Sequence, residues 1–224
     1  LIKKVMKKFK FLLASAFIAT LAFYSCETLD LDGTQDPNSI PPGVSDVNFK
    51  LNAIQVNFAS FFYELSDDSR GCVRMINQFG TYGSAADPLN TQTQWREAYA
   101  DVLKEIKNFK EEENQNLVPY HFAMAKILES YTYVSLVDFF GDVPYSEALL
   151  GAANIEPKVD SGAEIYDAML VNLDEAIALL NGPVPVARPT SDLFYNENAT
   201  NWIKLANYLK LKMYNNLRLT RDVS

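Results

Sequence analysis

Apolar residues recur at helical spacing along most of the chain after position 46. The clearest case has offsets of 0, 3, 4, 7, 8, 11 and 14 from its first member: Trp95, Ala98, Tyr99, Val102, Leu103, Ile106 and Phe109. Such offsets place side chains on one face of an α-helix. No stretch shows the apolar and polar alternation typical of a half-buried strand. The pattern therefore predicts an all-α protein.

The segment before this stripe is expected to form two consecutive helical pieces. The first begins near Val47 and has an apolar face: Val47, Leu51, Ile54, Phe58, Phe61, Phe62 and Leu65. The polar run SDDSRG at 66–71 is expected to break it, and a second piece should reach Met75 and Phe79. The loop GTYGSAADPLNTQ then leads to the next helix.

Start and stop signals define three further helices. Pro119 is tolerated in a first helical turn and opens a long segment that ends at Gly141. Ser161 and Glu164 have the spacing of a capping box, and their helix ends at the sequence NGP. A last helix starts near Thr200. Helix starts near 92, 118, 161 and 200 indicate two antiparallel hairpins, with a spacing similar to that of a tetratricopeptide unit.

The first 25 residues have the pattern of a secretory signal peptide. Five lysines and no acid precede an apolar run from Phe11 to Tyr24, which at about 14 residues is too short for a comfortable transmembrane helix. The stretch LAFYSC resembles the lipobox of bacterial lipoproteins. That resemblance implies that Cys26 becomes the first residue and carries a lipid on its sulfur. Plain secretion with a free or paired thiol is the alternative.

Residues 26–45 are polar and rich in turn residues, so they are expected to form a flexible tether behind the lipid anchor. The acidic stretch CETLDLD also resembles signals that send some lipoproteins to the outer leaflet of the outer membrane, which implies exposure on the cell surface. With Cys26 lipidated, only Cys72 remains. No intrachain disulfide is then possible, and Cys72 is interpreted as a small buried hydrophobic residue.

The charge balance excludes one class of partner. The formal net charge is −8, and removal of the signal peptide with its five lysines brings it to −13. Such a surface repels phosphate backbones, and the sequence contains no basic patch. Binding to nucleic acid is therefore not expected.

The stretch LVDFFGDVPYSEAL contains the strongest candidates for chemistry. Asp138 and Asp142 could form a catalytic or metal pair, but the only histidine, His121, lies about five helical turns earlier. Gly141 can adopt the left-handed conformation that ends a helix, and Pro144 fixes an extended exit. The stretch is therefore interpreted as a structural turn. Neither a nucleophile elbow nor a phosphate loop occurs, so no enzyme, cofactor or metal site is expected.

An aromatic residue outside the helical stripes is the best candidate for binding a ligand. Tyr82 stands between glycines in the loop GTYGSAADPLN, with Asn90 nearby. A ring can cover the apolar face of a pyranose while an amide bonds its hydroxyls, so Tyr82 and Asn90 are the predicted ligand-binding residues. Phe194 and Tyr195 are weaker candidates. Two further tyrosines follow the helical spacing and are interpreted as core: Tyr131 and Tyr133.

Several motifs resemble, in order, those of the SusD/RagB family of outer-membrane nutrient-binding lipoproteins. They are the lipobox cysteine with DLDGTQDPN, then WREAYADVLKEI, LVDFFGDVPYSEAL, IYDAMLVNLDEAIALL and NWIKLANYLKLKMY. The resemblance covers only the family's amino-terminal portion. Residues 46–224 are therefore expected to form an incomplete SusD-like helical domain, a superhelix of antiparallel helix pairs that is truncated at its C-terminus.

The resemblance also implies a function. It describes a lipoprotein of the cell outer membrane that captures oligosaccharides and passes them to a SusC-like, TonB-dependent transporter, without a cofactor. Two alternatives remain open: capture of peptides within the same family, and a helical scaffold that binds only proteins. The sequence does not name the ligand.

Overall fold

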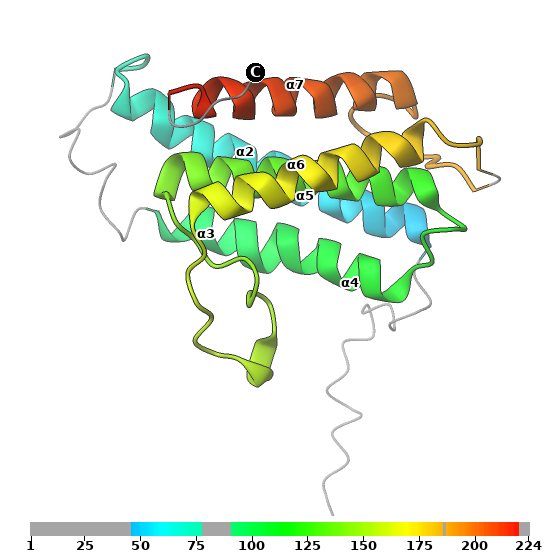
Figure 1. Cartoon of the computed structure of the whole chain (residues 1–224), viewed down its shortest axis with the longest axis horizontal. Helices are drawn as coiled ribbons and strands as arrows, with labels where there is room; N and C mark the ends of the chain where they lie inside the picture. The colour runs from blue at the N-terminus through cyan, green and yellow to red at the C-terminus, as the bar shows by residue number, and fades with distance from the viewer. Residues whose placement is uncertain (1–45, 78–90, 186, 220–224) are drawn as a thin grey trace, which may run out of the picture. The chain divides into compact units, whose positions relative to one another are not determined.

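The longer regular elements in the described part of the chain are all helices. The computed structural model describes residues 46–77, 91–185 and 187–219, all within one compact unit, Gly43–Ser224. The elements are α2 (Val47–Cys72), α3 (Gln92–Arg96), a π-helical segment η3 (Glu97–Leu103), α4 (Lys104–Glu112), α5 (Pro119–Phe140), a 3-10 turn η4 (Gly151–Ala153), α6 (Gly162–Leu180) and α7 (Ala199–Leu217). From α4 to α7, consecutive helices alternate in direction (Figure 1). The predicted all-α class with antiparallel helix pairs is confirmed.

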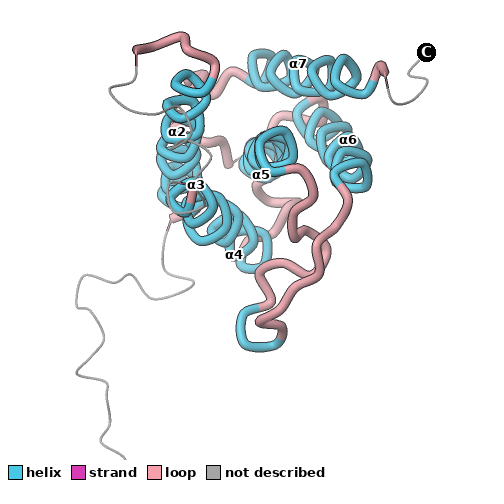
Figure 2. Tube along the Cα trace, turned by 90° about the vertical axis from the view of Figure 1, so that its left-hand side faces the viewer, coloured by secondary structure: helices cyan, strands magenta, loops and turns pink. Residues whose placement is uncertain are grey.

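Helix α5 forms the centre of the bundle because its sequence is apolar on nearly every side. Fifteen of its 22 residues are buried, whereas a surface helix buries only one stripe. Figure 2 shows α5 with α2, α3, α4, α6 and α7 arranged around it. The buried apolar residues of these helices join in one core cluster, which includes Phe61, Ile106, Met169 and Trp202.

The predicted break in α2 is wrong. The helix continues through residues 66–71 to Cys72. Its polar side chains form bonds that a helix accommodates, since the Ser69 hydroxyl donates to the carbonyl one turn earlier over 2.7 Å and Arg70 pairs with Asp67, three residues away. Polar residues here continue the helix instead of ending it.

The end of α2 differs from the sequence interpretation in two further ways. Met75 follows the helix in a turn instead of extending a second helical piece, and Phe79 lies outside the described residues. Cys72 is exposed and unpaired, so its interpretation as a buried hydrophobic residue was wrong.

Helices α3 and α4 are joined through η3 into one rod that carries the predicted apolar stripe. Ala98, Val102 and Phe109 are at most 1% exposed. The π-helical turns of η3 widen the rod locally, a change that apolar spacing alone does not reveal. Trp95, the first residue of the stripe, is 39% exposed and packs edge-on against Phe140, with ring centroids 5.4 Å apart.

The start of α6 is capped twice. The predicted capping box is confirmed, since the Glu164 amide donates to Ser161 Oγ over 3.3 Å and the Ser161 amide donates to Glu164 Oε2 over 3.4 Å. The Gly162 amide donates to Asp142 Oδ1 over 2.8 Å. A carboxylate at this end also suits the positive pole of the helix. Asp142 therefore acts as a structural link between the end of α5 and the start of α6.

Residues 141–161, which we call the α5–α6 loop, extend away from the helices and are yellow-green in Figure 1. The loop begins at Gly141, which has a φ of +83° and a ψ of −125°. The positive φ agrees with the expected helix end, but the ψ lies outside the left-handed helical region. A Cβ on Gly141 would meet no atom within 4 Å, so the backbone conformation alone is what favours glycine here.

Two main-chain bonds and one carboxylate close the base of the α5–α6 loop. The amides of Val143 and Asp160 each donate to the other residue's carbonyl, over 3.2 and 3.0 Å. The Asp160 carboxylate accepts from the amides of Tyr145 and Ser146, over 2.9 and 2.7 Å, and from the Ser146 hydroxyl over 2.8 Å. Burial alone would raise the pKa of Asp160, but these bonds outweigh it and lower the pKa to about 2. Asp160 therefore stays ionised and holds the ends of the loop together.

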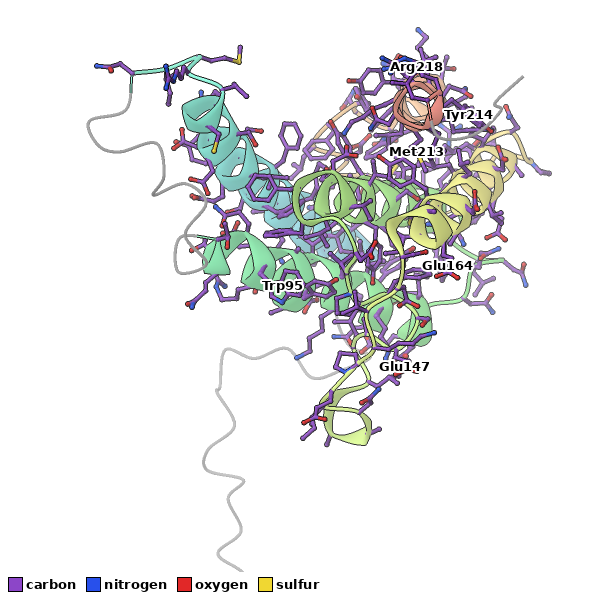
Figure 3. The ribbon with its side chains drawn as sticks, turned by 60° about the vertical axis from the view of Figure 1, so that its left-hand side comes forward. Trp95, Glu147, Glu164, Met213, Tyr214 and Arg218 are labelled. Atoms are coloured by element: carbon purple, nitrogen blue, oxygen red, sulfur yellow. The ribbon has the colours of Figure 1, made fainter. Side chains whose placement is uncertain are left out.

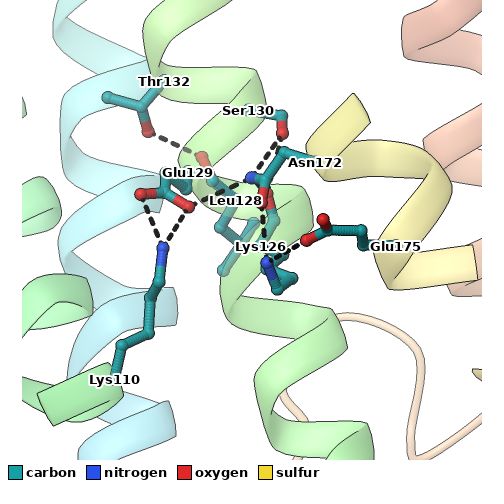
Figure 4. A network of polar contacts seen from close by, with 8 residues as sticks. All are labelled: Lys110, Lys126, Leu128, Glu129, Ser130, Thr132, Asn172 and Glu175. Carbon is teal, nitrogen blue, oxygen red and sulfur yellow. Dashed lines mark hydrogen bonds and ion pairs between the residues drawn. The ribbon is translucent and has the colours of Figure 1, made fainter. Parts of the chain in front are cut away.

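A polar network ties α4, α5 and α6 together (Figure 4). Lys110 of α4 pairs with Glu129 of α5 over 2.8 Å, and Lys126 of α5 pairs with Glu175 of α6 over 2.7 Å. Asn172 of α6 connects the two pairs, because it donates to Glu129 and accepts from Lys126, each over 3.0 Å. Side chains from three helices must meet for these bonds to form, so the network fixes the register of the helices.

Candidate functional site

A groove of about 400 Å³ lies between α2, α5 and α7, and we call it the α2–α7 groove. This volume falls in the range of small-molecule sites. Figure 3 shows α2 and α7 on different sides of α5, with side chains reaching into the space between them. The lining residues come from α2 and the turn after it, from α5 and from α7: Phe62, Leu65, Ser66, Ser69, Arg70, Val73, Met75, Ser135, Asp138, Phe139 and Lys212.

Phe62 presents an aromatic ring at this groove. It is 40% exposed, although the sequence placed it on the buried face of its helix. The ring stacks on Phe58, with centroids 6.1 Å apart and an interplanar angle of 22°, and meets Tyr131 edge-on at 5.4 Å. Neighbouring rings therefore hold the Phe62 ring in place, which leaves a preorganised apolar surface for a ligand.

Asp138 supplies a charged polar group at the groove. Its carboxylate accepts from Lys212 Nζ over 2.7 Å, from the Asn216 amide over 3.2 Å and from the Tyr166 hydroxyl. Burial, and then the bond to Asp138, raise the pKa of Tyr166, so its hydroxyl remains a donor. These three partners fix the carboxylate, and the Lys212 ammonium beside it can donate to a ligand oxygen.

Asp138 and Asp142 do not act as a pair. Asp138 faces α6 and α7, whereas Asp142 caps α6. Across the ranges that the structure describes, no group of three or more His, Cys, Asp or Glu residues could hold a metal ion. The groove offers a ligand ring contact, hydrogen bonds and charge.

Two weaker sequence candidates lie on the same aromatic cluster as Phe62. Phe194 meets Phe58 edge-on at 6.1 Å and is 36% exposed. Tyr195 is half-buried and packs edge-on against Trp202 at 5.3 Å. Tyr131 is also half-buried, with its ring between α2 and α7 residues, so the core interpretation holds for it only in part.

The principal sequence candidates, Cys26, Tyr82 and Asn90, lie outside the described residues and stay predictions. Sequence reasoning missed the α2–α7 groove, because its residues come from three helices far apart in the chain. One signal was present. Phe58, Phe61 and Phe62 crowd more aromatic surface onto one part of α2 than a single buried stripe accommodates.

The described helices pack as antiparallel pairs, which is the arrangement of tetratricopeptide-like helical proteins. A family model described as "Starch-binding associating with outer membrane", of the SusD-like type, matches residues 51–222. The chain therefore belongs to the SusD-like family.

Solved structures show the same fold. The chain is similar to a chitin-binding protein at 27% identity, with a TM-score of 0.64, over 77% of this chain and 39% of that one. A SusD/RagB family protein from Bacteroides thetaiotaomicron has 22% identity and a TM-score of 0.63, over 77% and 38% of the two chains. A SusD homologue from Bacteroides ovatus has 21% identity and a TM-score of 0.57, over 79% and 38%. The chain thus spans about two fifths of the length of these proteins. No curated protein matches it.

Proposed function

We propose that this chain is part of a cell-surface lipoprotein that binds oligosaccharides and delivers them to a TonB-dependent outer-membrane transporter. Membership of a family described as starch-binding supports the ligand class, as does likeness to a chitin-binding protein at 27% identity. One structural observation carries it: the exposed Phe62 ring stands beside the Asp138–Lys212 pair in an open groove.

The chemistry of the α2–α7 groove suits a sugar ring. A pyranose has an apolar face of C–H groups that packs on an aromatic ring, and hydroxyls at its edge that both donate and accept. Phe62 offers the ring, Asp138 offers an acceptor and Lys212 offers a donor. Binding of this kind makes no covalent change to the ligand.

Phe62→Ala is expected to weaken oligosaccharide binding by about five- to tenfold, because one ring contact is worth on the order of 1 kcal/mol. Isothermal titration of the purified protein with chitohexaose and with maltohexaose measures this. Tyr63→Ala is the matched control, since Tyr63 is the next residue of α2, is 61% exposed and does not line the groove. Equal losses in the two variants, or none in Phe62→Ala, would place the site elsewhere. Binding of peptides but not of either sugar would instead favour peptide capture.

Anchoring to the membrane is expected to depend on Cys26. In the described part of the chain, no helix has both the length and the apolarity that crossing a bilayer requires. The lipobox resemblance gives Cys26 the role of lipid carrier. Cys26→Ala should therefore move the protein from the membrane fraction to the soluble fraction, with Cys72→Ala as the control that stays bound. Mass spectrometry that finds a mature amino terminus other than a lipidated Cys26 would refute the anchor.

Delivery to a transporter calls for a stable contact with that protein. Co-purification from the outer membrane is the measurement, and a TonB-dependent barrel is the expected partner. Recovery of the barrel, together with no affinity of the full-length protein for sugars or peptides, would favour the helical scaffold.

A further inference from the structure

A second cavity, of about 520 Å³, lies between α4, α5 and the α5–α6 loop. We call it the loop cavity. Its main lining residues are Lys107 and Lys110 of α4, Glu129 and Tyr133 of α5, and Tyr145 and Leu149 of the loop. None of its lining residues belongs to the α2–α7 groove. It is therefore a separate candidate site.

Tyr133 is the feature that distinguishes the loop cavity. Its side chain lines the cavity, the residue is only 3% exposed, and its hydroxyl has no hydrogen-bond partner among the described residues. The Tyr145 ring meets that of Tyr133 edge-on, with centroids 4.9 Å apart, and its hydroxyl likewise has no partner in the described part of the protein. Two phenol groups are thus available to a bound molecule.

Both phenols stay protonated at physiological pH. Burial is the main cause that raises the pKa of Tyr133 and of Tyr145, and the nearby Glu129 carboxylate acts in the same direction. A neutral phenol donates one hydrogen bond and accepts others. The pair therefore suits a ligand whose groups do both, as alcohol hydroxyls do.

The charged residues of the loop cavity are compensated by one another. Lys110 pairs with Glu129 over 2.8 Å. Lys107 donates to the Leu149 carbonyl over 2.6 Å and lies 3.8 Å from Glu111. Two cations and two anions leave no net charge to attract an ion. The rest of the lining is apolar apart from Ser146, whose hydroxyl already donates to Asp160, so a neutral ligand with an apolar face fits the lining best.

The wall that the α5–α6 loop contributes is built in advance. Asp160 clamps the base of the loop, and the Tyr99 hydroxyl donates to the Pro144 carbonyl over 2.6 Å. Leu149 has a φ of +64°, a conformation that side chains disfavour, and the bond from Lys107 holds its carbonyl there. A preformed wall saves the ordering cost that a mobile loop would add to binding.

We propose that the loop cavity binds a neutral sugar unit, a hydroxyl-rich ring with an apolar face, with the Tyr133 and Tyr145 hydroxyls bonded to it. This goes beyond the proposed function, in which an oligosaccharide lies in the α2–α7 groove. The protein would then have two independent sugar sites with no lining residue in common.

Titration of the purified protein with glucose and with N-acetylglucosamine, followed by NMR up to ~10 mM, tests this. Saturable binding of at least one of the two sugars is expected, and Tyr133→Phe should weaken it by about two- to tenfold, the worth of one hydrogen bond. Tyr120→Phe is the matched control, because Tyr120 is another buried tyrosine of α5 that does not line the cavity. A thermal melt of each variant shows that it is folded.

Three results would overturn the second site: no saturable binding of either sugar, equal losses in Tyr133→Phe and Tyr120→Phe, or tighter binding of glucuronate than of glucose. Phe62→Ala separates the two sites. It should leave the monosaccharide titration unchanged while it weakens chitohexaose or maltohexaose. If Phe62→Ala abolished monosaccharide binding, the monosaccharide and the hexaose would both be bound in the α2–α7 groove, and the second site would be refuted. If Phe62→Ala left hexaose binding unchanged, only the proposed function of the groove would be contradicted.

Discussion

Asp192→Ala is expected to lower the free energy of unfolding by about 3 kcal/mol, because it removes the acceptor of one buried and two part-buried donors, and a buried donor left without a partner costs roughly 1–3 kcal/mol. Asp192 is 7% exposed. Its carboxylate accepts from the indole N–H of Trp202 over 2.7 Å and from the amides of Phe194 and Glu197, each over 3.0 Å. Trp202 is fully buried, so water cannot replace the lost acceptor.

Urea unfolding is the measurement, and the dependence of the free energy of unfolding on urea concentration should be the same in the variant and the parent protein. Asp174→Ala is the matched control, because the Asp174 carboxylate is 60% exposed and its only bond in the described structure is an ion pair with Lys210. An exposed pair of this kind contributes at most about 1 kcal/mol. If the free energy of unfolding fell by the same small amount in both variants, the Asp192 carboxylate would not be what stabilises the turn before α7.

Acidification is expected to destabilise the fold through His121, in the window from about pH 6.5 down to about 4. His121 is fully buried, and its Nε2 lies 3.1 Å from Asn48 Oδ1. Its Nδ1 has no partner in the described part of the chain. Burial lowers the pKa of His121 to about 4, although the charges of Asp46 and Glu113 oppose this. The folded state therefore favours the neutral ring.

The lowered pKa of His121 determines that acid destabilises the folded state. Above the unfolded pKa near 6.5 both states carry a neutral ring, and the stability is fully present. Below about pH 6.5 the His121 ring binds a proton in the unfolded state but stays neutral in the folded state. The free energy of unfolding therefore falls by up to ~1.4 kcal/mol per pH unit. Fluorescence-detected urea unfolding between pH 7 and pH 4 measures the slope. His121→Gln should flatten it, and an equally steep slope in that variant would assign the pH dependence to other groups.

Helix positions could be predicted from the sequence because each depends on local signals. The stripe from Ala98 to Phe109, the proline at the start of α5 and the capping box of Ser161 all combine a backbone preference with residues a few positions apart. The break predicted at residues 66–71 failed for the same reason. Polarity in a short window does not show that Ser69 and Arg70 find partners within the helix.

The sites could not be predicted, because they depend on which helices meet. Phe62 and Lys212 are ordinary members of two amphipathic helices until the bundle brings them to one groove. Tyr133 was correctly assigned to the interior, since it is 3% exposed, but helical spacing could not show that a loop residue 12 positions later would pack its ring against it.

The clamp at the base of the α5–α6 loop makes the helical bundle tolerant of changes in loop length. Val143 and Asp160 hold the two ends of the loop together, so the path between them does not set the register of α5 against α6. Ile155, in the middle of the loop, is 83% exposed. Each doubling of a flexible loop costs only about 0.6 kcal/mol in closure entropy. A peptide tag or a small domain inserted beside Ile155 would therefore be displayed outside the fold, where evolution can also vary the chain at little cost.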